Sequence, residues 1–139
     1  DWLARAGEAA AQLASWAMPY DYAFPGESEF GRLGVPTVGS VFANAQNKHA
    51  APGLCTHSGL FLLRLFRHQG DERYLRLLAA IARFLPWAVS RADRPIRAQD
   101  GRVLPEGWIN ERVNTSDWDE NLGGVFYGST WSEVSLLLT

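Results

Sequence analysis

The amino-acid sequence predicts an all-α fold built from helical hairpins. Apolar side chains at helical spacing, or in mostly apolar runs, mark four segments: residues 2–18, 56–69, 72–85 and 125–138. Gly70 and Asp71 join the second segment to the third, and these residue types favour a helix end followed by a helix start. A turn this short permits only an antiparallel helical hairpin.

The first predicted helix, residues 2–18, has an apolar stripe along one face. The stripe residues recur at steps of four and three: Trp2, Ala6, Ala9, Leu13 and Trp16. Alanine content favours helix here, and Pro19 closes the segment.

The central hairpin pairs two helices of different character. Residues 56–69 are apolar except at Arg64, Arg67 and His68, which predicts an inner helix buried over most of its circumference. Residues 72–85 are amphipathic instead. Arginines form the wet face, and the dry face comprises Tyr74, Leu77, Leu78, Ile81 and Leu85. Pro86 ends or kinks this helix.

Two long connections, residues 20–51 and 92–122, separate the helices. Val41-Phe42-Ala43 fits either a strand or a helical turn, and Val103-Leu104 is the best candidate for a short strand. A tight turn at one end of the helices and long loops at the other suit a toroid of helical hairpins. In such a toroid the long loops gather at one rim over a central cavity, where function tends to lie.

Composition narrows the classes of function. A length of 139 residues argues against two domains, and the formal net charge of −2 gives no support to nucleic-acid binding. No stretch has the roughly 20 apolar residues of a membrane span. The single cysteine, Cys55, fits a cytoplasmic or a secreted bacterial protein, and we expect a soluble one. The closing apolar run has no cap, which predicts that residues 1–139 are part of a larger domain.

The second loop, from Pro105 to Asn121, concentrates polar and aromatic residues. It contains five carboxylates, three asparagines, one arginine and two tryptophans. Indole faces stack on the apolar C–H faces of sugar rings, while amides, carboxylates and guanidinium groups hydrogen-bond the ring hydroxyls. The loop therefore predicts saccharide binding, with contacts expected from Trp108, Asn110, Arg112, Trp118, His49 and Trp131.

Glycosidic-bond cleavage requires two carboxyl groups, one protonated and one ionised. The candidates are Glu111, Asp117 and Asp119, and a carboxyl close to Trp118 would be suited to the acid role by desolvation. Acidic loops with Asn and Ser are also common as solvated turns and helix caps. Glu106 and Glu120 are assigned to that class.

Other chemistries lack a motif. His49 and His57 could ligate a metal with Asp117 or Asp119, but no HxH or HExxH spacing is present. Glycine-rich nucleotide-binding patterns and the Gly-x-Ser-x-Gly elbow are missing as well. We therefore expect no metal and no cofactor.

Two stretches resemble the six-hairpin glycosidase superfamily. Residues 49–59, running into 60–71 and Arg73-Tyr74-Leu75, are similar to a hairpin of these proteins. Residues 107–119, with Gly123-Gly124 and Trp131-Ser132-Glu133, resemble their rim loops and next inner helix. The resemblance covers roughly residues 45–139 and stops at the level of the superfamily.

This resemblance implies part of an (α/α)6 toroid that acts on saccharides, with glycoside hydrolysis as the expected activity. A full toroid has twelve helices, so one catalytic carboxylate can lie outside these residues. The rest of the same protein, or other chains, would then cover the exposed hairpin flanks. Two alternatives stay open: a non-catalytic saccharide-binding or scaffold module, and a polysaccharide lyase or sugar epimerase that uses His49, His57 or Tyr127 as acid and base.

Overall fold

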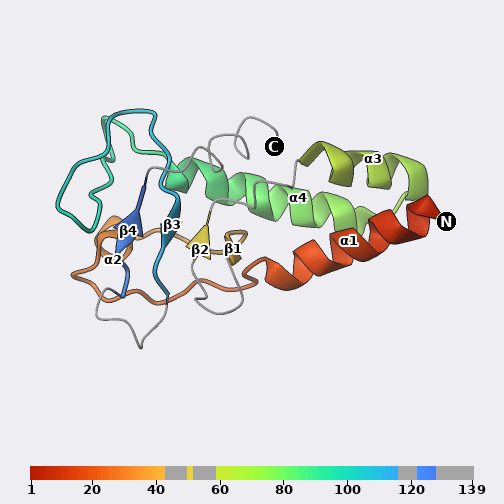
Figure 1. Ribbon diagram of the computed structural model, residues 1–139, viewed down its shortest axis with the longest axis horizontal. Coiled ribbons are helices and arrows are strands. Elements are labelled where there is room, and N and C mark those ends of the chain that lie inside the picture. Colours follow the sequence, from red (N-terminus) through yellow and green to blue (C-terminus); the bar gives the residue numbers. More distant parts are fainter. Residues whose placement is uncertain (43–49, 52–58, 116–121, 128–139) are drawn as a thin grey trace.

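The computed structural model describes residues 1–42, 50–51, 59–115 and 122–127. The chain is mostly helical, as its sequence predicts. The α-helices are α1 (Trp2–Trp16), α2 (Glu29–Leu33), α3 (Gly59–Gln69) and α4 (Glu72–Phe84), followed by the 3-10 helix η1 (Leu85–Ala88). Figure 1 shows α1 and α3 toward one end of an elongated molecule, α2 toward the other, and α4 running between them.

The predicted hairpin forms from α3 and α4. Gly70 ends α3 with φ of 68°, and its N–H donates to the Phe66 carbonyl at 2.7 Å. Asp71 caps α4 because its carboxylate accepts the Arg73 N–H at 3.0 Å. Both capping residues are therefore confirmed. Pro86 lies in η1, where the α-helix gives way to the tighter 3-10 form.

The structure contains a small four-stranded sheet that the sequence does not predict. It contains β1 (Val41–Phe42), β2 (Ala50–Ala51), β3 (Arg112–Val113) and β4 (Val125–Phe126), antiparallel and in sequence order. The choice left open at Val41-Phe42 is settled as strand. Val103 forms a single bridge to Arg97. The helix expected over 125–138 is wrong at its start, because Val125 pairs with Val113 in the sheet; residues 128–139 lie outside the described part.

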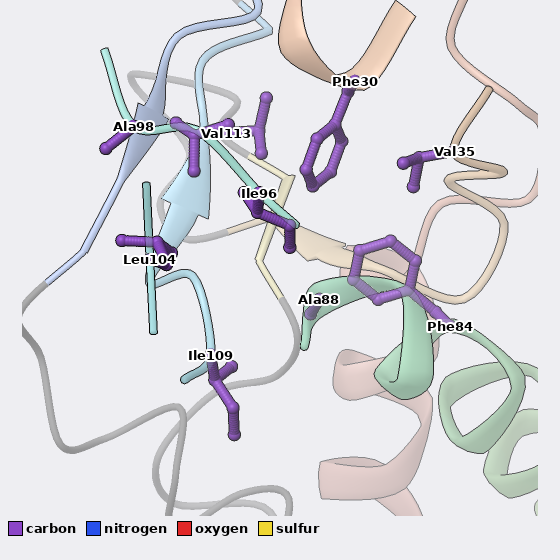
Figure 2. Close-up of a cluster of buried hydrophobic side chains, with 10 residues drawn as sticks. Phe30, Val35, Phe84, Ala88, Ile96, Ala98, Leu104, Ile109 and Val113 are labelled. Carbon is purple, nitrogen blue, oxygen red and sulfur yellow. The ribbon is translucent and has the colours of Figure 1, made fainter. Parts of the chain in front are cut away.

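Two clusters of buried side chains hold the chain together. The helical core comprises Ala10, Leu13, Val41, Leu62, Leu65 and Ile81. The sheet core comprises Phe30, Val35, Phe84, Ala88, Ile96, Ala98, Leu104, Ile109, Val113 and Val125. Figure 2 shows that loop, helix and strand residues all contribute to the sheet core, with Phe84 and Ala88 entering from one side. Burying a side chain such as Phe84 contributes roughly 1.5–3 kcal/mol to folding.

The helices bury narrower faces than their sequences predict. On α1, Ala10 and Leu13 are buried, whereas Trp2 is 90% exposed. On α3, Gly59, Leu62 and Leu65 are buried, while Leu60 is 47% exposed. The expectation that this helix is buried over most of its circumference is therefore wrong. Among the described helices, none combines the length and hydropathy that a membrane span requires.

The loop before β1 packs directly on the backbone of α4. Gly39 has φ of 87°, and its N–H donates to the Met18 carbonyl at 3.0 Å. A Cβ atom at Gly39 would lie 2.0 Å from the Ala80 carbonyl oxygen. Only glycine permits both this conformation and this approach, so Gly39 fixes the loop between α1 and the sheet against α4.

Gly39→Ala is expected to lower the free energy of unfolding by about 2–4 kcal/mol, because steric overlap adds to the penalty of a left-handed backbone. Gly101→Ala is the matched control, since Gly101 has φ of 83° and no atom beyond its chain neighbours lies within 4 Å of the position that a Cβ would take. It should cost only about 1–2 kcal/mol. Urea unfolding monitored by circular dichroism measures both. Equal losses in the two variants would show that the contact with Ala80 is unimportant.

Candidate functional site

Residues 105–115 form a segment that is held by backbone hydrogen bonds on two sides. Its first part is hydrogen-bonded to the chain at the end of η1. The Ser90 N–H donates to the Trp108 carbonyl at 2.7 Å, and the Asn110 N–H donates to the Ala88 carbonyl at 2.9 Å. Its second part joins the sheet, where the Glu111 N–H donates to the Phe126 carbonyl at 2.8 Å. The segment is thus fixed to α4 through η1 and to β4.

Trp108 presents an aromatic surface to solvent. Its side chain is 45% exposed, although its backbone is bonded on both sides. The indole lies beside the ring of Tyr127, with the ring centroids 6.4 Å apart and the planes tilted by 49°. A rigid backbone and a neighbouring ring restrict the indole without covering it, which is what a stacking platform requires.

Glu111 and Arg112 form an ion pair three and four residues after Trp108. Arg112 Nη1 donates to Glu111 Oε1, and the side chains are 28% exposed for Arg112 and 31% for Glu111. The Arg112 guanidinium also lies 4.3 Å above the ring of Phe126. The ion pair orients the partly exposed Glu111 carboxylate and holds the Arg112 guanidinium beside it.

Asn110 occupies a different environment from its neighbours. The residue is 0% exposed, and neither side-chain atom of its amide has a hydrogen-bond partner among the described residues. An unpartnered buried polar group costs roughly 1–3 kcal/mol. The predicted contact of Asn110 with a sugar stays a prediction, since its amide lies below the surface on which Trp108 is exposed.

The remaining predicted site residues lie outside the described part of the chain. They are the catalytic candidates Asp117 and Asp119, together with Trp118, His49 and Trp131. His57 of the lyase alternative is outside it too. Of the predicted site residues, the described part of the chain contains Trp108, Asn110, Glu111 and Arg112, and an ion pair joins Glu111 to Arg112.

Two further residues, Asp100 and Arg102, lie at this site without having been predicted there. The Tyr127 hydroxyl donates to Asp100 Oδ2 at 2.9 Å, and the Arg102 N–H donates to Asp100 Oδ1 at 3.0 Å. The Arg102 guanidinium lies 5.5 Å from the centre of the Tyr127 ring. In the sequence, Asp100-Gly101 indicates only a turn. The contact with Tyr127, 27 residues later, has no local signal.

Hydrogen bonding changes the acid–base properties of this cluster. The Arg102 N–H and then the Tyr127 hydroxyl stabilise the carboxylate, which lowers the pKa of Asp100 below its ordinary value. Burial, and then the bond to Asp100, raises the pKa of Tyr127. Near neutral pH, Asp100 is therefore an acceptor and Tyr127 a neutral donor.

The described residues also line two hollows outside the Trp108 surface. One, of about 440 Å³, is lined by Pro25, Glu27, Ser28, Glu29, residues 97–99 and residues 122–125. The other, of about 600 Å³, is lined by Ala82, Leu85, Pro86, Val89, Arg91, Asp93 and Glu106. Neither lining includes Trp108 or Glu111. Within the described residues, no group of three or more His, Cys, Asp or Glu side chains is placed to hold a metal ion.

Comparison with known proteins finds no matching family model, no similar curated protein and no similar solved structure. Function is therefore inferred from the geometry and chemistry of the described residues.

Tyr127→Phe is expected to raise the pKa of Asp100 toward its ordinary value of about 3.9, because one of the two hydrogen bonds to the carboxylate is lost. A carbon-13 NMR titration of the Asp carboxyl groups measures this shift. Asp93 is the internal control, since its pKa is lowered by Arg91 instead.

The same titration has a consequence for stability. Because the pKa of Asp100 is lower in the folded chain, its bonds stabilise the fold above pH of about 3.9 and are lost as the pH falls through the lower folded value. An unchanged Asp100 midpoint in Tyr127→Phe would show that the hydroxyl does not act on this carboxylate in solution.

Proposed function

We propose that this chain is part of a carbohydrate-active enzyme that hydrolyses glycosidic bonds, and that its helical hairpin belongs to an (α/α)6 toroid. One observation carries the proposal. An exposed indole, Trp108, lies beside Tyr127 on the same anchored segment as the partly exposed carboxylate of Glu111. A platform for a sugar ring and a carboxylate within a few residues of it are the first requirements of glycoside hydrolysis.

The contacts of Glu111 favour one of the two carboxylate roles. Arg112 Nη1 donates to Glu111 Oε1, so the carboxylate is held as a hydrogen-bond acceptor, which is the part that a base or a nucleophile plays. We therefore assign Glu111 to the base or nucleophile. The acid is then assigned to Asp117 or Asp119, with Trp118, His49 and Trp131 as further sugar contacts; all five lie outside the described residues.

A saccharide-binding module without catalysis is the second candidate. The specific observation in its favour is that Arg112 pairs with Glu111 and lies over Phe126, so the ion pair also serves to hold the segment on β4. The lyase or epimerase alternative is weaker for the described residues. The pKa of Tyr127 is raised and its hydroxyl donates a hydrogen bond to Asp100, so the phenol stays protonated and does not suit a catalytic base at neutral pH.

The proposed toroid needs further hairpins. Apolar side chains such as Trp2 and Leu60 are exposed here, and we propose that the rest of the same protein, or other chains, packs against them. The sequence of the intact gene tests this requirement. A coding region without further helical hairpins would contradict the toroid.

Trp108→Ala is expected to weaken binding of neutral oligosaccharides about tenfold or more, because loss of a stacking face removes on the order of 1.4 kcal/mol. Calorimetric titration with cellopentaose, xylopentaose, maltopentaose and mannopentaose measures it. Tyr20→Ala is the matched control, since Tyr20 is an aromatic side chain that is 58% exposed and follows α1. Equal affinities for Trp108→Ala and the unaltered protein would show that Trp108 is not a stacking platform for sugars.

Glu111→Gln is expected to lower the hydrolysis rate by roughly 10²–10⁴-fold while binding is kept, since the amide can neither attack nor accept a proton. Release of reducing ends from the same oligosaccharides provides the measurement. Glu106→Gln in the same loop is the control and should retain full activity. Binding without turnover in the unaltered intact protein would favour the non-catalytic module.

A further inference from the structure

The Asp100 carboxylate lies at the edge of the aromatic pair and keeps hydrogen-bonding capacity. It accepts the Arg102 N–H on Oδ1 and the Tyr127 hydroxyl on Oδ2, and its side chain is still 44% exposed. An ionised carboxylate offers about four acceptor positions. The two internal bonds orient the group, and acceptor positions remain for donors from solvent or from a ligand.

Both guanidinium groups that contact the aromatic side chains of this site already have a carboxylate. Arg102 Nε lies 3.6 Å from Asp100 Oδ2, and Arg112 is paired with Glu111. Each positive charge is thus matched by a negative one beside it. A sugar that carries a carboxylate would place its negative charge near Asp100 and Glu111, and neither ion pair has an unmatched cation to balance that charge. A neutral sugar would instead find acceptors for its hydroxyl groups.

We propose that Trp108, Tyr127 and Asp100 form a subsite for neutral saccharides, in which a pyranose ring stacks on Trp108 and its hydroxyl groups donate to Asp100. Tyr127 is a positioning residue, because it contacts the indole through its ring and fixes the carboxylate through its hydroxyl. The inference rests on the proposed function and adds to it the class of sugar and a binding residue that the sequence does not indicate.

The chemistry favours hydroxyl donors in particular. Hydrogen bonds from neutral donors to an ionised acceptor are stronger than bonds between neutral groups. The lowered pKa of Asp100 keeps the carboxylate ionised throughout the neutral range. Its bonds to Arg102 and Tyr127 are made before a ligand arrives, so little ordering of the side chain is left to be done on binding.

Calorimetric titration of Asp100→Asn with the four neutral pentasaccharides and with trigalacturonate tests the subsite. The unaltered protein is expected to bind at least one neutral pentasaccharide more tightly than trigalacturonate. Asp100→Asn should weaken that binding about tenfold, since a charge-assisted bond is lost. Tyr127→Phe should weaken it less, by roughly threefold, because the carboxylate remains but is less well oriented.

Asp93→Asn is the matched control, because Asp93 is also an exposed aspartate paired with an arginine two residues away. It should bind as the unaltered protein does. A pH series separates a binding role from a structural one: affinity of the unaltered protein should fall as Asp100 is protonated, and the affinity of Asp100→Asn should not follow that titration.

The outcomes distinguish failure of the subsite from failure of the proposed function. If Trp108→Ala loses binding while Asp100→Asn keeps it, the subsite is wrong and the proposed function stands. Tighter binding of trigalacturonate than of every neutral pentasaccharide would overturn the assignment to neutral sugars. If none of the five probes binds the unaltered protein, the proposed function fails and the subsite fails with it.

Discussion

The structure depends on the apolar face of α4, which continues into η1 and serves both cores. Ile81 packs in the helical core, and three residues later Phe84 packs in the sheet core, where Ala88 follows it. One helix therefore joins two groups of side chains that otherwise contact different parts of the chain. Removing the Phe84 side chain would cost about 3–5 kcal/mol, the usual value for deleting a buried aromatic ring.

The end of this helix is held by Arg94. Its guanidinium donates to the carbonyls of Pro86, Trp87 and Val89 at 2.6, 3.0 and 3.2 Å, and it lies 4.7 Å from the centre of the Trp87 ring. The last carbonyls of a helix have no partner within the helix, and here one side chain satisfies three. Burial lowers the pKa of Arg94, yet the group stays charged at any physiological pH.

This support extends to the candidate site. The Ala88 carbonyl accepts the Asn110 N–H, so the segment that carries Trp108 and Glu111 is bonded to the end of η1 that Arg94 holds in place. The other side of the segment is bonded to β4, which also places Tyr127 beside Trp108. The position of the exposed indole is thus a consequence of packing around α4.

The helices could be predicted from the sequence because their signals are local. Apolar spacing, Gly70 and Asp71 all act within a few residues. The sheet has strands of two residues, too short for an alternating pattern, and its pairs join Ala50 to Val113 across 63 positions. The helix prediction fails at Val125 for the same reason: its neighbours are apolar, and only its pairing with Val113 decides its conformation.

The same difference between local and long-range signals applies to the residues of the candidate site. Trp108, Glu111 and Arg112 stand out by composition within one loop, so the sequence indicates them. Asp100 and Arg102 belong to an ordinary turn and acquire a role only through contact with Tyr127. The burial of Asn110 is likewise invisible in the sequence, because exposed loops and buried segments use the same polar residues.

The most direct test of saccharide binding at Trp108 is the indole N–H spectrum of the protein during titration with the neutral pentasaccharide that binds best. If the sugar stacks on Trp108, the Trp108 resonance shifts with saturation while those of Trp2, Trp16 and Trp87 stay in place. A saturable shift at Trp2 or Trp87 with none at Trp108 would contradict stacking on Trp108.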